Sequence, residues 1–320
     1  MSSVLNPASS AAAPRAQHFW RRALGHRSFV VGAVLTLLLI ATAALSLVWT
    51  PFSPYEMNIP GKLQPPMSVA GPSQDATAPS GGSAAHEVAS VGAQKLHWLG
   101  TDPFGRDITS LLLVGARASI LVGVIAVSIG LVLGTALGLL AAARRGWVEE
   151  AIMRLSDFSF AFPAILSAIM MTAVFGAGIV NAIIAIGIYN IPTFARITRA
   201  SANAVWSREF VLAARACGKG PLSITLEHVL PNIYSVLIVQ ATIRFAIAIL
   251  AEAALSYLGL GTQPPQPSWG RMLSEAQTLM FDAPLLAVWP GLAIAFAVLG
   301  LNLLGDGLRD LLDPRLSRKR

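Results

Sequence analysis

The chain has 320 residues, of which 54% are hydrophobic and only 12% are charged. Its mean hydropathy of +0.63 lies outside the range of an ordinary soluble domain and indicates a membrane protein. The net charge of +7 requires no nucleic-acid partner, because the placement of Lys and Arg around the apolar runs accounts for it.

Six apolar runs are long enough to cross a hydrocarbon core of about 30 Å, which takes roughly 20 helical residues. Each should be an α-helix, because lipid offers the backbone no hydrogen-bond partners. A short turn around Gly176 and Gly178 separates the third run from the fourth. The predicted spans are residues 28–49, 118–143, 159–176, 178–195, 233–253 and 286–304.

Positive residues set the orientation of these spans. With the N-terminus placed inside, 17 of the 23 Lys and Arg residues lie on the inner side. They fall in the N-terminal tail, the turn at 144–157, the segment 196–232 and the C-terminal tail. Both termini and residues 196–232 are therefore predicted to be cytoplasmic.

The first run follows arginines, as a secretory signal does, but it is too long for a signal core and five more spans follow.

Residues 51–117 form the first predicted outer loop. Within it, residues at about 69–93 are of low complexity, and we expect them to be flexible. Asp102, Arg106 and Asp107 then precede the stretch ITSLLLVGA, which would form an amphipathic helix along the membrane surface. Asp102 is expected to cap a turn and Arg106 to pair locally, with direct contact to a solute as the alternative.

The alternative for the cytoplasmic segment 196–232 is a plain connecting loop, but the segment is longer than such a loop needs to be. Apolar residues recur in it at helical spacing. We expect one helix face to hold Trp206, Phe210, Ala213, Ala214 and Cys217. Gly218 would cap this helix or allow a close backbone approach, and Gly220 with Pro221 favours a second, short helix.

Two residues are expected to end this segment. Pro231 would stop the short helix, and Asn232 would cap the fifth span. The single cysteine, Cys217, excludes an intrachain disulfide.

The spacing here resembles the cytoplasmic signature of ABC importer permeases: Glu-Ala-Ala, three residues, Gly, nine residues, an apolar residue, one residue, Leu-Pro. The matching positions are Ala213, Ala214, Gly218, His228, Leu230 and Pro231. Leu212 stands in the place of the glutamate, and His228 in that of the apolar residue. The resemblance implies a coupling helix that docks in a groove of an ATPase subunit. Glu209, Arg215 and Lys219 are candidates for polar docking contacts.

Three further stretches resemble the C-type permease of dipeptide and oligopeptide importers. They are HWLGTDPFGRDITSLLLVGARASILVGV at 97–124, AEAALSYLGLGTQPPQPSWGRMLSEA at 251–276 and LNLLGDGLRDLLDPR at 301–315. The first contains the outer motif Asp102, Gly105, Arg106 and Asp107. The resemblance runs from about residue 20 to 316, and the stretch at about 69–93 is an insertion relative to the family.

Arg244 and Glu252 fall in or near the fifth span, where ionisable groups usually face the protein interior or a water-filled path. They lie about 12 Å apart along a helix axis at 1.5 Å per residue, too far for a direct ion pair. Gln240, one turn earlier, is a candidate hydrogen-bond neighbour of Arg244. All three are candidates for lining a transport path, and a structural bond to another helix is the alternative for Arg244.

Other chemistries find little support. Gly218-Lys219 lacks the preceding glycine and the following Ser or Thr of a phosphate loop. The energy for transport must therefore come from another chain. The histidines at 18, 26, 86, 97 and 228 show no metal-ligand spacing. An intramembrane enzyme would need two acids, or a Ser and a His, within spans. A passive channel or carrier would not need the long cytoplasmic segment.

The resemblance therefore implies an all-α type I ABC importer permease with six transmembrane helices in a bacterial inner membrane. It implies no reaction and no cofactor in this chain, because two partner ATPases bind ATP and Mg. A related B-type permease, a periplasmic or lipid-anchored binding protein and membrane lipid are the other expected partners, with no nucleic acid. The implied substrates are dipeptides or oligopeptides, with glutathione, opines or nickel as alternatives.

The implied organisation has five parts. They are a cytoplasmic tail at 1–27, the first helix at 28–50, a periplasmic loop at 51–117, a five-helix core at 118–304 with the coupling segment 196–232, and a cytoplasmic tail at 305–320.

Overall fold

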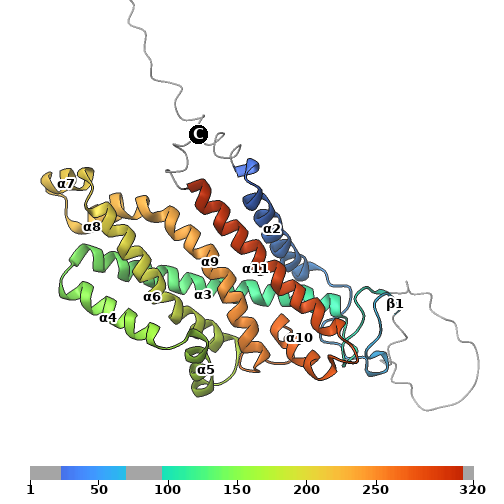
Figure 1. The fold of residues 1–320 in the computed structure, drawn as a ribbon. Helices are drawn as coiled ribbons and strands as arrows, with labels where there is room; N and C mark the ends of the chain where they lie inside the picture. Colours follow the sequence, from blue (N-terminus) through green and yellow to red (C-terminus); the bar gives the residue numbers. More distant parts are fainter. Residues whose placement is uncertain (1–22, 70–95, 313–320) are drawn as a thin grey trace, which may run out of the picture.

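A computed structural model describes residues 23–69 and 96–312, which form a helical body with one short β-ribbon (Figure 1). In the ribbon, β1 (Ser68–Val69) pairs antiparallel with β2 (Leu96–His97). A 3₁₀ turn at Ile59–Gly61 precedes it. Nearly all of the insertion at about 69–93 lies outside the described residues.

Five described helices are long and apolar enough to cross a membrane. They are α2 (Arg27–Val48), α3 (Ile108–Arg144), α6 (Ile179–Trp206), α9 (Leu230–Tyr257) and α11 (Leu285–Leu312). A sixth span is present if the bent pair α4 (Trp147–Ala161) and α5 (Ala164–Phe175) counts as one. The predicted all-α membrane fold is confirmed.

The third predicted span, 159–176, is not a single straight helix. α4 and α5 meet at 85°. Pro163 explains the break, because a proline disfavours helical geometry in the residue before it. Phe162 accordingly has an extended backbone, with φ −101° and ψ 132°.

Other helices extend beyond their apolar runs. α3 begins at Ile108, so the predicted separate amphipathic helix is instead the first part of a 37-residue helix. Gly115 stands between this stretch and the apolar run, but a single glycine is tolerated in a helix, so helix formation continues into the run. α11 likewise continues from its predicted end at 304 to Leu312.

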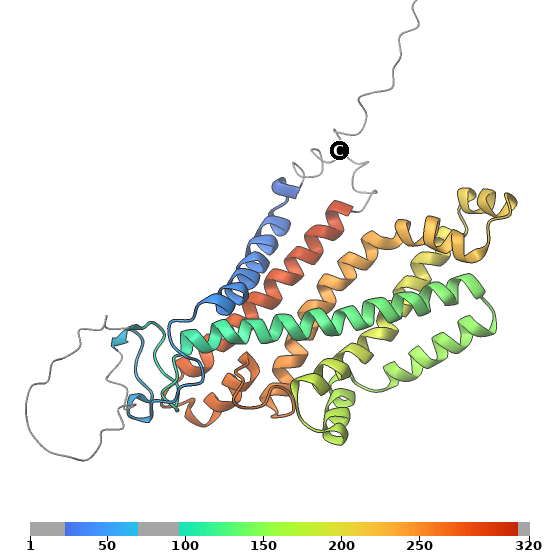
Figure 2. The same ribbon diagram turned by 180° about the vertical axis from the view of Figure 1, so that it is seen from behind.

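The body has two ends, which Figures 1 and 2 show from opposite sides. One carries α7 (Glu209–Ala216) and α8 (Pro221–Ile224), and we call it the α7 end. The start of α2 and the end of α11 lie toward it, joined by an ion pair of 3.3 Å between His26 and Asp310. The opposite end, which we call the α10 end, carries α10 (Trp269–Ala276), a 3₁₀ turn at Gln277–Leu279 and the β-ribbon.

The most extensive helix contact among the described residues is between α3 and α6. Small residues allow helix backbones in a membrane to approach closely. A Cβ at Gly134 would lie 2.5 Å from the Ile191 carbonyl oxygen, and one at Gly138 would lie 2.5 Å from the Ala195 carbonyl oxygen. Phe194, fully buried, packs in the same core. The two helices therefore form one unit from which the other helices extend.

Replacing Gly134 with leucine is expected to separate α3 from α6, because the side chain has no room. Overpacking of this kind typically costs about 1–3 kcal/mol. Thermal unfolding of the purified protein in detergent should shift several degrees downward. Gly291→Leu on α11 is the matched control, since no described atom lies within 4 Å of a Cβ there. Equal melting temperatures for the two variants would contradict the packing account.

Candidate functional site

The segment after α6 folds as two short helices joined at Gly218. α7 ends in a Schellman motif, in which two amides bond back to the last turn. The Gly218 amide donates to the Arg215 carbonyl oxygen at 2.9 Å, and the Lys219 amide donates to that of Ala214 at 3.1 Å. Gly218 has a φ of 81°, which disfavours any side chain. The predicted helix cap is confirmed. Among described residues nothing lies within 4 Å of a Cβ built at Gly218, so no close approach occurs within the chain.

The buried face of α7 differs from the predicted one. Val211 is fully buried, and Ala214 packs partly buried against the core that contains Trp206. The exposed residues are Phe210, Ala213 and Cys217. The chain turns at residues 207–208 between α6 and α7, so the helical spacing that linked Trp206 to the later residues is interrupted.

α8 runs into α9 without a stop. Residues Thr225–Val229 form a π-helical turn between them, and Pro231 lies in the first turn of α9. The predicted proline stop and Asn232 cap are therefore wrong. Asn232 Nδ2 instead donates to the His228 carbonyl oxygen at 2.6 Å. The wider π turn accommodates a proline that lacks an amide hydrogen and would clash in a regular helix.

Polar contacts tie α7 and α8 together. Lys219 Nζ forms an ion pair with Glu227, whose carboxylate also accepts a hydrogen bond from the Ser223 hydroxyl at 2.7 Å. Lys219, predicted to contact the ATPase, thus has a partner within its own chain. Glu209 is exposed, and Arg215 is exposed with its guanidinium 5.3 Å from the Trp206 ring centre.

Three exposed leucines lie at the α7 end, and we call them the leucine surface. They are Leu212, Leu222 and Leu226, with exposed fractions of 52%, 72% and 54%. Leu212 stands at the acidic position of the family signature. Leu222 and Leu226 were missed in the sequence, although their spacing of four places them on one helix face. Leu222 and Leu226 thus present neighbouring exposed apolar side chains, and Leu212 adds a third on the adjacent helix α7.

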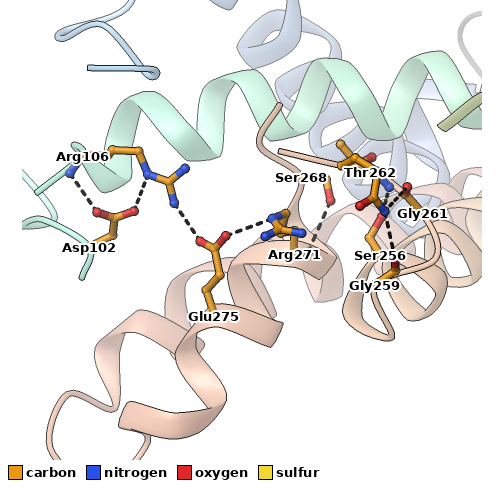
Figure 3. A network of polar contacts seen from close by, with 10 residues as sticks. Asp102, Arg106, Ser256, Gly259, Gly261, Thr262, Ser268, Arg271 and Glu275 are labelled. Atoms are coloured by element: carbon orange, nitrogen blue, oxygen red, sulfur yellow. Dashed lines mark hydrogen bonds and ion pairs between the residues drawn. The ribbon is translucent and has the colours of Figure 1, made fainter. Parts of the chain in front are cut away.

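At the α10 end, the outer motif forms a closed turn (Figure 3). Asp102 Oδ1 accepts hydrogen bonds from the amides of Phe104 and Arg106, each at 2.8 Å. Its Oδ2 accepts from Arg106 Nε at 2.6 Å. Gly105 has a φ of 74°, and a Cβ there would overlap the Asn58 carbonyl. The predicted Asp102 cap and local Arg106 pair are confirmed.

The same motif holds α10 in place. Arg106 Nη2 donates to Glu275 at 2.7 Å, and Arg271 Nε donates to the other oxygen of that carboxylate at 2.9 Å (Figure 3). Asp107 caps α3 by accepting from the Ser110 amide at 2.8 Å, and its second oxygen contacts His97 Nδ1 at 2.9 Å. Two neighbouring polar clusters thus form at this end: Arg106 joins the turn before α3 to α10, and Asp107 joins the β-ribbon to the start of α3.

Glu252 lies in the interior near the same end and is fully buried. Ser256 Oγ donates to its carboxylate at 2.7 Å, Thr262 Oγ1 at 3.3 Å and Ser119 Oγ at 3.4 Å. Figure 3 shows how Ser256 also accepts from the Thr262 amide, at 2.9 Å. Glu252 therefore joins α3, α9 and the loop that leads to α10.

Arg244 is half-buried in α9. Its Nε atom is buried and has no hydrogen-bond partner among the described residues. Gln240, also half-buried, precedes it by one turn. Glu252 accepts hydrogen bonds from hydroxyl groups and forms no ion pair with Arg244 in the described structure. The prediction that these two residues are too far apart for a direct ion pair is therefore confirmed.

No group of three or more His, Cys, Asp or Glu side chains in the described ranges could hold a metal ion. Of the five histidines, His18 and His86 lie outside those ranges.

Comparison with known proteins identifies related families over most of the chain. Residues 134–318 match the family described as binding-protein-dependent transport system inner membrane component. Residues 15–66 match the N-terminal TM domain of oligopeptide transport permease C.

Individual relatives agree with these matches. The glutathione transport system permease protein GsiD of Pectobacterium atrosepticum is 39% identical over 301 residues, covering 94% of this chain and 91% of the relative. Escherichia coli GsiD is 50% identical over 220 residues, covering 69% of this chain and 73% of the relative. The dipeptide transport system permease protein DppC of Alkalihalophilus pseudofirmus is 46% identical over 220 residues, covering 69% and 72%.

A solved structure supports the fold. A chain of the MetNI methionine ABC transporter in an inward facing conformation aligns with a TM-score of 0.54 at 18% identity. The alignment covers 63% of this chain and 97% of that one. The type I importer fold predicted from the sequence is confirmed.

With five to six membrane-length helices among the described residues, the chain has a multi-pass membrane fold. The chain belongs to the family of binding-protein-dependent transport system inner membrane components and is an ABC importer permease of the DppC/OppC type. It is a transport component of the inner membrane rather than an enzyme.

Replacing Arg106 with alanine is expected to destabilise the protein by about 3–5 kcal/mol, the usual cost of leaving a buried ionic partner unpaired. The Arg106 side chain is 9% exposed, and those of Asp102 and Glu275 are 7% and 19% exposed. Arg154→Ala is the control, because Arg154 and Glu150 are 77% and 66% exposed, and exposed pairs contribute about 0.2–1 kcal/mol. The free energy of unfolding of both variants can be measured in mixed micelles. Similar losses of stability in the two variants would contradict a stabilising role for the contacts of Arg106.

Proposed function

We propose that the α7 end faces the cytoplasm and the α10 end faces the periplasm. The proposal is supported by the 17 Lys and Arg residues in the two tails, the 144–157 turn and the 196–232 segment. In this arrangement the tails at 1–27 and 305–320 are cytoplasmic. The loop at 51–117 faces a binding protein.

Residues 196–232 transmit movement from an ATPase to the membrane helices. One observation carries this proposal: Val211, Ile224 and Val229 are each at most 1% exposed and belong to the core formed with α6 and α9. α7 and α8 are therefore not a loose loop. A displacement of either helix shifts α6 and α9 together, since packed helices move as bodies.

Docking on the ATPase is mainly apolar in this proposal. The leucine surface enters a groove of the ATPase, with Glu209 and Arg215 at its polar rim. Lys219 stiffens the segment through Glu227. Apolar contact at the centre and charge at the rim is the common arrangement of protein interfaces. Leu212 then replaces the family's acidic contact with buried apolar area. His228 and Leu230 are half-buried and Pro231 is exposed, at the point where the π turn joins α9.

Binding-protein-dependent permeases work with ATPase and binding-protein partners and a second permease. We assign ATP and Mg to two cytoplasmic ATPase subunits and the solute path to the interface with a B-type permease. The binding protein, periplasmic or lipid-anchored, delivers the solute to the α10 end. Transport then proceeds by alternating access.

The proposed solutes are dipeptides and short oligopeptides, and the dipeptide permease among the relatives supports this class. Glutathione is the second candidate, because the relative that covers 94% of this chain is a glutathione permease. Glutathione is itself a tripeptide, so one path can serve both.

Gly218→Val tests the coupling role in a complex reconstituted with its ATPases and binding protein. The variant is expected to insert and assemble but to lose at least about 90% of ATP-driven dialanine uptake, because a β-branched residue disfavours the φ of 81° that sets the angle between α7 and α8. Gly220→Val is the control, since Gly220 has a φ of −72° and open space around it.

Wild-type uptake in this assay should stop when the ATPases or ATP are omitted. Uptake that continues without them would support a passive carrier and overturn the proposed function. Full coupling in Gly218→Val would overturn only the role of the α7–α8 angle.

A further inference from the structure

Arg244 lies deep in a membrane helix. α8, the π turn and α9 form one continuous helical segment, Pro221–Tyr257, and Arg244 precedes its end by 13 residues. At 1.5 Å per residue, that is about 20 Å from the end of the helix. A charge at such depth is costly and is retained where it meets a partner or a polar path.

The described chain supplies no counter-charge. None of its ion pairs includes Arg244, and the Nε atom has no hydrogen-bond partner. Glu252, the carboxylic acid of α9, is held by hydroxyl groups of three segments. A buried donor without a partner is expensive, so a partner from outside the chain is implied.

Arg244 shares a face of α9 with Leu237 and Ala248, which belong to the buried core that includes Ala182 and Ile186 of α6. On another side, Thr242 and Phe245 line an apolar groove between α2, α3, α9 and α11, which Arg244 does not line. The Tyr189 phenol of α6 interacts electrostatically with Arg244. Tyr189 contacts Phe160 of α4 edge to face, with ring centres 6.1 Å apart. Gln240 lies one turn from Arg244, on the same side.

We propose that Arg244, with Tyr189 and Gln240 beside it, binds a carboxylate of the solute as it crosses the membrane. A guanidinium presents paired donors that match a carboxylate, and phenol and amide groups can donate further hydrogen bonds. The half-buried side chain leaves part of the guanidinium open to a bound solute.

This assignment rests on the proposed function and narrows its substrate class. Peptides and glutathione both carry carboxylates and fit the site. A free divalent metal cation would be repelled by an unpaired arginine at this depth, so nickel does not fit.

The test compares alanyl-alanine with its C-terminal amide in proteoliposomes containing the complete transporter. Each probe is supplied at a concentration that saturates the binding protein, so that differences arise in the membrane subunits. Arg244→Gln is expected to slow uptake of the acid about tenfold or more, as loss of a charged hydrogen bond of at least ~1.4 kcal/mol predicts. Uptake of the amide should change less than about twofold, and Arg244→Lys should fall between wild type and Arg244→Gln for the acid.

Arg154→Gln, at an arginine 77% exposed on α4, is the matched control and should leave both rates unchanged. Equal loss for acid and amide, or no loss for either, would overturn the carboxylate site. If the Arg244→Gln complex loses the second permease on purification, the carboxylate site would also be overturned. Arg244 would then be assigned to a contact between the two permease subunits. Failure of the wild-type complex to take up either probe would instead overturn the proposed peptide function.

Discussion

The close approach of α3 to α6 is the contact on which the rest of the structure depends. Without room for a side chain at Gly134 or Gly138, the two backbones are held at a fixed separation. α6 leads directly to α7, and α3 begins at the polar clusters of Asp107 and Arg106 at the opposite end. A rigid pair of helices therefore connects the two ends of the molecule.

Polar contacts stabilise the α10 end, whereas apolar contacts determine how the α7 end is held. Glu252 and Glu275 each accept hydrogen bonds from more than one segment, which fixes α10 against α3 and α9. Val211, by contrast, anchors α7 through burial alone. In the proposed arrangement, the α10 end that receives the solute stays ordered, and the α7 end that docks on the ATPase moves together with α6 and α9.

The sequence predicted the helices well because long apolar runs in a membrane permit little else. The Gly218 cap and the Asp102 turn were also predictable, because each depends on neighbours within a few residues. Long-range partners were not. Nothing local indicates that Arg106 meets Glu275, 169 residues away. The continuation of the helix through Pro231 depends on a π turn that no residue type specifies, and the bend at Pro163 was overlooked although proline is its usual signal.

The α7 end is proposed to lie in the cytoplasm and to dock on the ATPase. Cys217 tests this directly, because it is the single cysteine of the chain and is exposed beside Gly218. A membrane-impermeant maleimide should label Cys217 in inverted vesicles but not in intact spheroplasts. Bound ATPase subunits should slow that labelling about tenfold or more. Labelling in spheroplasts, or an unchanged rate with the ATPases bound, would contradict the account.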